Sequence, residues 1–250
     1  MKARRRLIVP WLGPEDPFPP AHTALRHPNG LLAAGGTLAV STLLDAYARG
    51  IFPWFNEDEP VMWWSPDPRM VLLPRELHVS RSLARRMRKG GFDVTLDTAF
   101  ERVIHECAAP RATDVGTWIS ERMIRAYARL RAAGYAHSVE IWMDGELAGG
   151  LYGVAIGRAF FGESMFTRRT DASKIALVSL VRLLERWGFG LIDCQMRTDH
   201  LASLGAREVP RAEFLRVLRE LVPDGVRPGS DWGQTGSDPM MASRRGQTPV

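Results

Sequence analysis

Residues 137–166 determine the centre of the fold and read HSVEIWMDGELAGGLYGVAIGRAFFGESMF. It predicts three strands, which cover residues 137–143, 146–156 and 159–166. Asp144-Gly145 and Gly157-Arg158 separate these strands, and two-residue turns of this kind join antiparallel neighbours. A long helix follows and ends near Trp187. Its polar residues form only a narrow stripe, so we expect it to be mostly buried.

Further elements extend this pattern in both directions. Residues 190–196 predict another strand after the long helix, and residues 211–222 predict an amphipathic helix. Together these elements indicate a fold that combines helices and strands, of the α/β (α+β) class. Residues 10–36 are rich in proline and glycine, so we expect more loop and turn there than regular structure. The expected organisation is a small N-terminal domain, a larger domain and a disordered tail, over residues 1–60, 61–224 and 225–250.

The charge of the chain favours a polyanionic partner. The formal net charge is +5 and the isoelectric point is about 9.7, which suits RNA or an anionic surface. A helix expected over residues 81–89 has a basic face, made of Arg81, Arg85, Arg86, Arg88 and Lys89. Cys107 and Cys194 are far apart and fit a reducing compartment. No stretch is long and apolar enough to span a bilayer, so we expect a soluble cytoplasmic protein.

Aromatic residues in loops suggest how RNA could be bound. Trp54 and Trp118 belong to a set of rings in or beside loops with proline or glycine, together with Phe55, Trp63 and Trp64. Such rings can stack on unpaired bases, at ~1–3 kcal/mol per base. The alternative is that they fix the loops by hydrophobic packing.

Two carboxylates lie in apolar surroundings, where an unpaired charge is costly. Glu163 lies between Phe160 and Phe166, so it must face solvent or hold a partner, which is either a substrate or Arg168 or Arg169 nearby. Asp193 lies in an otherwise apolar strand. The two-residue strand period places Asp193 and Gln195 on one face, which indicates a polar site. The alternative is a structural aspartate that caps a helix.

Motifs for nucleotides, metals and serine nucleophiles are absent from the sequence. It has no Gly-rich phosphate loop, no metal-ligand spacing among its six histidines and no G-x-S-x-G turn. We therefore expect neither a cofactor nor a metal.

Seven short strings stand out along the chain. They are LLAAGG at 31–36, RGIFPWF at 49–55, WWSPDPR at 63–69, GTWI at 116–119, GESMF at 162–166, LIDCQ at 191–195 and SLGA at 203–206. In this order they resemble the leucyl/phenylalanyl-tRNA–protein transferases. Seven ordered strings of this kind make the resemblance very specific.

The resemblance implies a fold and a reaction. The larger domain would have an N-acetyltransferase-like (GNAT-type) fold, a mixed sheet flanked by helices. The enzyme would be an aminoacyltransferase that moves leucine or phenylalanine from aminoacyl-tRNA to the N-terminal Arg or Lys of a protein, with methionine as a further candidate. The addition would mark the acceptor for degradation by the N-end rule. Neither a cofactor nor a membrane partner is implied.

The resemblance also assigns roles to individual residues. Trp54 and Trp118 would flank the terminal adenosine of the tRNA. The amino-acid side chain would enter a pocket lined by Leu151, Phe160, Leu177, Leu180 and Ile192. Glu163, Asp193 and Gln195 would hold the polar ends of the substrates. Asp193 and Gln195 would be the catalytic pair, in which Asp193 orients the amine or acts as a general base and Gln195 positions or relays the proton.

Two other functions remain open at this point. A CoA-dependent N-acyltransferase of the same fold would carry a Q/R-x-x-G-x-G/A loop before a helix. The nearest candidate, Arg186 to Gly190, has a different spacing and precedes a strand. An RNA-binding module without catalysis would not need the Asp193 and Gln195 pair. A transfer assay with charged tRNA discriminates among the three.

Overall fold

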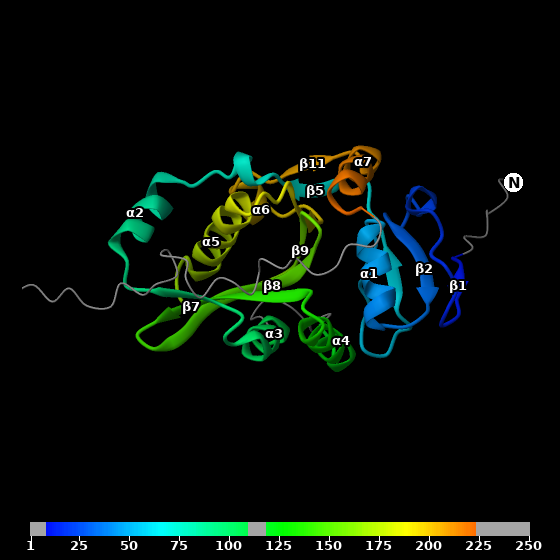
Figure 1. Cartoon of the computed structure of the whole chain (residues 1–250), viewed down its shortest axis with the longest axis horizontal. Coiled ribbons are helices and arrows are strands. Elements are labelled where there is room, and N and C mark those ends of the chain that lie inside the picture. The colour runs from blue at the N-terminus through cyan, green and yellow to red at the C-terminus, as the bar shows by residue number, and fades with distance from the viewer. Residues whose placement is uncertain (1–8, 110–118, 224–250) are drawn as a thin grey trace, which may run out of the picture.

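The computed structural model describes residues 9–109 and 119–223, whose strands form two sheets (Figure 1). The smaller sheet has four strands in the order β1-β2-β4-β3. Their bounds are Trp11–Leu12 for β1, Leu31–Gly35 for β2, Phe52–Pro53 for β3 and Met62–Trp64 for β4. Most of residues 10–36 is loop and turn, as expected, although β2 pairs with both β1 and β4. The tail expected over 225–250 lies outside the described residues.

The larger sheet has seven strands in the order β11-β5-β10-β9-β8-β7-β6. Their bounds are Arg69–Leu72 for β5, Asp93–Leu96 for β6, Ala136–Met143 for β7, Glu146–Ile156 for β8, Ala159–Thr167 for β9, Leu191–Gln195 for β10 and Arg207–Val209 for β11. The pair β9 and β10 is parallel and the other neighbours are antiparallel, so the sheet is mixed. The chain passes from the smaller sheet to the larger one between Trp64 and Arg69.

The three strands predicted from residues 137–166 are confirmed as β7, β8 and β9. The turn between β7 and β8 has a positive φ at both Asp144 (54°) and Gly145 (77°). A two-residue hairpin whose twist matches its strands requires this backbone, and Asp-Gly adopts it at little cost. The local sequence therefore determines the centre of the sheet.

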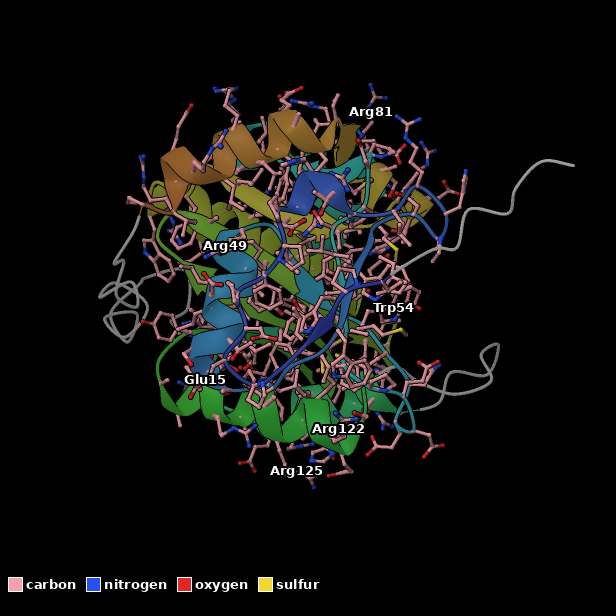
Figure 2. All side chains as sticks on the ribbon, turned by 90° about the vertical axis from the view of Figure 1, so that its right-hand side faces the viewer. Glu15, Arg49, Trp54, Arg81, Arg122 and Arg125 are labelled. Atoms are coloured by element: carbon pink, nitrogen blue, oxygen red, sulfur yellow. The ribbon has the colours of Figure 1, made fainter. Side chains whose placement is uncertain are left out.

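Helices cover both faces of the larger sheet, which confirms the expected α/β class (Figure 1). Their bounds are Val40–Ala48 for α1, Arg81–Lys89 for α2, Phe100–Ala108 for α3, Glu121–Ala132 for α4, Ala172–Arg186 for α5, Asp199–Ala202 for α6 and Arg211–Leu221 for α7, with 3-10 turns at Ala21–Thr23 and Pro74–Glu76. The long helix α5 is mostly buried, as predicted, and packs on β7 and β8. The helices α3 and α4 cover the opposite face, and Figure 2 shows α1 between α7 and α4.

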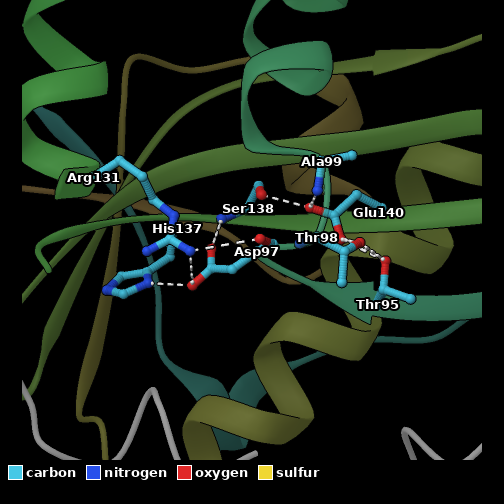
Figure 3. Close-up of polar contacts among 8 residues, drawn as sticks. All are labelled: Thr95, Asp97, Thr98, Ala99, Arg131, His137, Ser138 and Glu140. Carbon is cyan, nitrogen blue, oxygen red and sulfur yellow. Dashed lines mark hydrogen bonds and ion pairs between the residues drawn. The ribbon is translucent and has the colours of Figure 1, made fainter. Parts of the chain in front are cut away.

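A buried carboxylate fixes the start of α3 (Figure 3). Glu140 on β7 is fully buried and accepts hydrogen bonds from the hydroxyls of Thr95, Thr98 and Ser138. It also accepts from the backbone N–H groups of Thr98 and Ala99, at 3.4 Å each. The first turn of a helix has N–H groups without partners inside the helix, and here a neighbouring strand supplies the acceptor.

Two hydrophobic cores lie on the two faces of the larger sheet. One lies beneath α5 and includes Phe160, Leu177 and Ile192. The other lies with α3 and α4 and continues into the smaller sheet, where it includes Trp63. None of the helices in the described ranges is long and apolar enough to cross a membrane.

Candidate active site

A cavity of about 930 Å³ lies where β8, β9 and β10 meet α5 and the end of β3. Most of the residues predicted for the site line it, namely Trp54, Leu151, Phe160, Glu163, Leu177, Leu180, Ile192 and Gln195. Asp193 does not line it, and Trp118 lies outside the described residues. The structure therefore brings most of the predicted residues to one cavity, while their roles stay predictions.

One part of the cavity wall is apolar. Leu151 from β8, Phe160 from β9 and Ile192 from β10 are all buried, and Phe160 pairs with Ile192 across the parallel strands. Leu177 and Leu180 on α5 are three residues apart and so lie on one face of the helix. Because these side chains offer no hydrogen-bonding group, this part of the cavity suits an apolar ligand group.

Gly153 on β8 makes room for the ring of Phe160. A Cβ atom at this position would lie 2.6 Å from two ring carbons of Phe160 and 2.3 Å from the carbonyl oxygen of Phe161. Any larger residue would push the ring out of place, so glycine is needed for close packing here.

The polar part of the wall centres on Glu163 of β9, whose side chain is nearly buried, at 8% exposure. Its carboxyl oxygens lie 2.7 Å from the hydroxyl of Tyr47 and 2.6 Å from that of Tyr127. The two hydroxyls are also hydrogen-bonded to one another. The amide of Gln195 donates to Glu163 at 3.0 Å. Burial raises the pKa of the Glu163 carboxyl to about 7, although the hydrogen bonds from Tyr127 and Tyr47 oppose this rise.

Asp193 forms an ion pair behind the cavity wall. Its carboxylate is 0% exposed and accepts from Nε and a terminal nitrogen of Arg69, at 2.8 and 2.6 Å. The guanidinium group lies between the rings of Phe52 and Phe214, 4.7 Å from each ring centroid. A planar cation held by a two-pronged carboxylate contact and by two aromatic faces is strongly fixed. This geometry favours a positioning role for Asp193.

Gln195 connects the ion pair to the cavity. The pairing of β10 with β5 shifts register between Asp193 and Gln195, and Gln195 has a φ of 62°. Its backbone N–H donates to Asp193 Oδ1 at 2.9 Å, while its side chain reaches Glu163. Asp193 thus fixes the unusual backbone that aims Gln195 at Glu163.

Trp54 is the exposed ring at the edge of the cavity (Figure 2). Its side chain is 37% exposed and meets Trp64 edge to face, at 5.5 Å between ring centroids. Trp64 Nε1 donates to the carbonyl oxygen of Trp54 at 2.7 Å, which fixes the loop. Phe55 and Trp63 are buried instead, so hydrophobic packing explains these two rings, while Trp54 is free to stack on a ligand.

The alternative partners considered for Glu163 are engaged elsewhere. Arg168 forms a two-pronged ion pair with Glu106 at 2.7 Å, and Arg169 pairs with Asp144 at 3.0 Å. The partners that Glu163 does have, Tyr47 and Tyr127, were not predicted. Both lie on the apolar faces of α1 and α4, where a tyrosine looks like core. The only signal in the sequence is that a buried tyrosine hydroxyl usually needs a partner.

Within residues 9–109 and 119–223, no group of three or more His, Cys, Asp or Glu side chains is arranged to hold a metal ion.

The family models and the related proteins that match this chain agree on one family. The sequence model of the leucyl/phenylalanyl-tRNA protein transferase family matches residues 71–219, and the model of the N-terminal domain of that family matches residues 36–67. The leucyl/phenylalanyl-tRNA–protein transferase of Nitrosospira multiformis is 61% identical over 225 residues, which cover 90% of this chain and 97% of that protein. The transferase of Thiobacillus denitrificans is 66% identical over 85% of this chain and 93% of that protein.

Solved structures resemble the chain more distantly. A GCN5-related N-acetyltransferase from Kribbella flavida matches with a TM-score of 0.37 and 16% identity, over 67% of this chain and 59% of that chain.

Proposed function

Because the chain belongs to the leucyl/phenylalanyl-tRNA protein transferase family, we propose that its cavity joins the aminoacyl end of a charged tRNA to the N-terminal amine of an acceptor protein. Transfer of an amino acid from tRNA to a protein is the activity of this aminoacyltransferase family. Family membership thus decides against the CoA-dependent alternative. The observation that carries the proposal is one cavity with an apolar wall, a nearly buried carboxyl group and an exposed tryptophan at its edge.

The apolar wall would receive the side chain of the donor amino acid. Leucine, phenylalanine and methionine could all fill a space lined by Leu151, Phe160, Leu177, Leu180 and Ile192. Differences of one methylene are worth only ~1–3 kcal/mol in such a pocket, so discrimination among apolar donors is weak. A charged donor would be buried without a partner and rejected.

The edge of the cavity would hold the terminal adenosine of the tRNA. Trp54 offers an exposed ring face there, and stacking on it would tolerate any base. Trp118 stays a predicted second wall of this stack. The exposed arginines of α2 would contact phosphates farther along the tRNA.

The polar part of the wall would receive the acceptor, a protein with N-terminal Arg or Lys. Its α-amino group has a pKa of about 7.7–8.0, so a useful fraction is neutral at cytoplasmic pH. The aminoacyl ester is already activated, and placing amine and ester together supplies much of the rate. Gln195 would position the amine, and Asp193 would hold Gln195 through its backbone. The product would then be marked for degradation by the N-end rule.

A donor-selectivity assay tests this proposal. Purified protein, an Arg-initiated peptide and charged tRNA alone should give transfer of Leu, Phe and Met. Asp or Lys should be transferred at least about 100-fold more slowly, because a buried charge lacks a partner. Phe160→Asp should abolish transfer. The control, Phe160→Leu, keeps the wall apolar and should retain it.

Two results would contradict the proposal. One is efficient transfer of Asp or Lys by the wild type. The other is an absolute requirement for ATP, CoA or a metal, since the ester itself holds the free energy. The thermal unfolding midpoint of each variant must be compared with that of the wild type, so that a folding defect is not mistaken for a pocket defect.

A further inference from the structure

Three polar groups from distant parts of the chain meet beside the cavity. The carboxyl group of Glu163 on β9 contacts Tyr47 of α1 through Oε1 and Tyr127 of α4 through Oε2, at 2.7 and 2.6 Å. The two tyrosine hydroxyls contact one another. The three groups therefore close a ring of three O–H···O contacts.

The number of protons in this ring favours a protonated Glu163. Each O–H···O hydrogen bond needs one proton between its two oxygens, and each tyrosine hydroxyl supplies one. The amide of Gln195 donates to Oε1 and adds no proton between the oxygens. If Glu163 were ionised, two protons would serve three contacts, and one pair of oxygens would meet lone pair to lone pair. A protonated Glu163 supplies the third proton, and it then donates one of its two contacts with the tyrosines while the other tyrosine donates to it.

The surroundings of the ring also favour a neutral acid. Both tyrosines are fully buried, and burial raises their pKa values well above the ordinary value, so they keep their protons. Behind Glu163, Asp193 is already paired with Arg69. In the described part of the chain, neither lysine nor arginine forms an ion pair with Glu163, although a buried carboxylate would need a cationic partner.

Tyr152 of β8 is a further ionisable group beside the ring. Its ring lies 5.4 Å from that of Tyr127, and it is fully buried. Its hydroxyl has no hydrogen-bond partner among the described residues. Tyr152 thus shares the burial of the two ring tyrosines without their contact to Glu163, which makes it a matched control.

We propose that burial keeps Glu163 a neutral acid, that Tyr47 and Tyr127 hold it in a closed hydrogen-bonded ring, and that Glu163 supplies the proton that aminoacyl transfer must move. This inference rests on the proposed placement of the two substrates in the cavity. Glu163 lines the cavity and is the catalytic group, whereas Tyr47 and Tyr127 are positioning residues that act through it. The pKa of Glu163, raised to about 7 by burial, supports the same assignment.

In the reaction, this ring gives up one proton and later takes one back. The acceptor nitrogen forms a bond to the ester carbon, and the bond from that carbon to the ribose oxygen of the tRNA breaks. The proton of Glu163 goes to the departing ribose oxygen. The resulting carboxylate accepts hydrogen bonds from both tyrosine hydroxyls. It then takes the surplus proton from the acceptor nitrogen. The ring returns to its starting state, and neither an oxidant nor a reductant is needed.

Infrared spectroscopy tests the ring without any substrate. The difference spectrum of wild type minus Glu163→Gln isolates the C=O band of a protonated Glu163. We expect this band at about pH 6 and its loss near pH 7, far above the ordinary glutamate value of about 4.3. Tyr47→Phe and Tyr127→Phe each remove a donor to the carboxylate and should move the midpoint to higher pH. Tyr152→Phe should leave it unchanged.

Single-turnover rates test the proton transfer. Glu163→Gln should fold, because its amide can replace the acid in the ring, with one oxygen acceptor and one N–H donor. Its chemical step should nevertheless slow by at least about 100-fold, since an amide cannot exchange the proton. Affinity for charged tRNA should stay within about twofold. The phenylalanine variants of the ring tyrosines should instead move the pH profile of the rate toward higher pH.

The outcomes separate the ring from the proposed function. A wild-type band that titrates in the ordinary glutamate range would overturn the ring. A wild-type transfer rate in Glu163→Gln would overturn the proton role. If the wild type failed to transfer leucine at all, the proposed function would fail while the infrared result on the ring still held.

Discussion

At the scale of single residues, the ion pair of Asp193 and Arg69 carries a large energetic consequence. Both side chains are 0% exposed, and the guanidinium group lies between two aromatic rings. Asp193→Ala would leave the charge of Arg69 buried without a partner. We expect this variant to lose about 3–5 kcal/mol of unfolding free energy in a urea titration.

A double variant is the control for this prediction. In Arg69→Met with Asp193→Leu, both charges are replaced by apolar groups, and most of the lost stability should return. If the double variant were as unstable as Asp193→Ala, loss of packing rather than an unpaired charge would explain the effect. Transfer rates of Asp193→Asn should be compared under conditions where it is fully folded. The pH dependence of the transfer rate seen in the wild type should persist in Asp193→Asn, because the titration of Glu163 causes it.

The same residues show how far the sequence could predict the site. The strand period predicted that Asp193 and Gln195 lie on one face of their strand. The resemblance predicted which residues line the apolar wall. The partner of Asp193 lies 124 positions away, and the partners of Glu163 lie 116 and 36 positions away. Contacts over such separations follow from how whole elements pack, and no local pattern encodes them. The positive φ of Gln195 likewise results from the shift in register with β5.

At the scale of elements, local signals predicted the central hairpins but not the group that stabilises the start of α3. The Asp144-Gly145 turn fixes its own hairpin. The start of α3 is stabilised by Glu140 from β7 and not by Asp97 just before the helix (Figure 3). Asp97 accepts from the backbone N–H of Ser138 and pairs with His137, both at 2.8 Å. The spatial neighbour that caps a helix cannot be read from the residues before it.

The basic helix α2 lies at one end of the molecule (Figure 1) and gives a prediction about tRNA binding. Arg81 and Arg85 are exposed, whereas Arg86 folds back onto Gly90 and Phe92 and is not part of the face. Reversing both charges with Arg81→Glu and Arg85→Glu should weaken binding of every charged tRNA. The slope of log affinity against log salt should fall by about 1 per lost phosphate contact. Filter binding across salt concentrations measures both quantities.

The matched control for α2 is the pair Arg216→Glu and Arg219→Glu on α7. These arginines are also exposed, and the change in net charge is identical. The control should retain most of the affinity and the wild-type slope. If both double variants weakened binding equally, the effect would come from net charge alone, and α2 would be an ordinary solvated helix.

At the scale of the whole molecule, one hydrophobic core joins the two sheets. It extends from the smaller sheet through α1 to α4 and α7, and Figure 2 shows α1 between these two helices. Arg122 of α4 reinforces this junction, since it lies over the ring of Phe55 at 4.9 Å and donates to the carbonyl oxygen of Glu59. The division of the chain at residue 60 stays a prediction about domains. The shared core predicts that both parts unfold in one transition.

A pair of glycines tests this cooperativity. Gly50 ends α1 with a φ of 70°, and a Cβ atom there would lie 2.6 Å from Leu215 and 2.7 Å from Phe214 of α7. Gly188 ends α5 with a φ of 73°, and no atom lies within 4 Å of its Cβ position. Alanine costs about 1–2 kcal/mol at either site because of the left-handed backbone. Only Gly50→Ala adds a clash, which should cost a further ~1–3 kcal/mol.

In urea, fluorescence and far-ultraviolet circular dichroism should report one transition for the wild type and both variants, with the lowest midpoint for Gly50→Ala. A curve that splits in two for Gly50→Ala would show that the sheets unfold separately, because this clash lies at the junction between them.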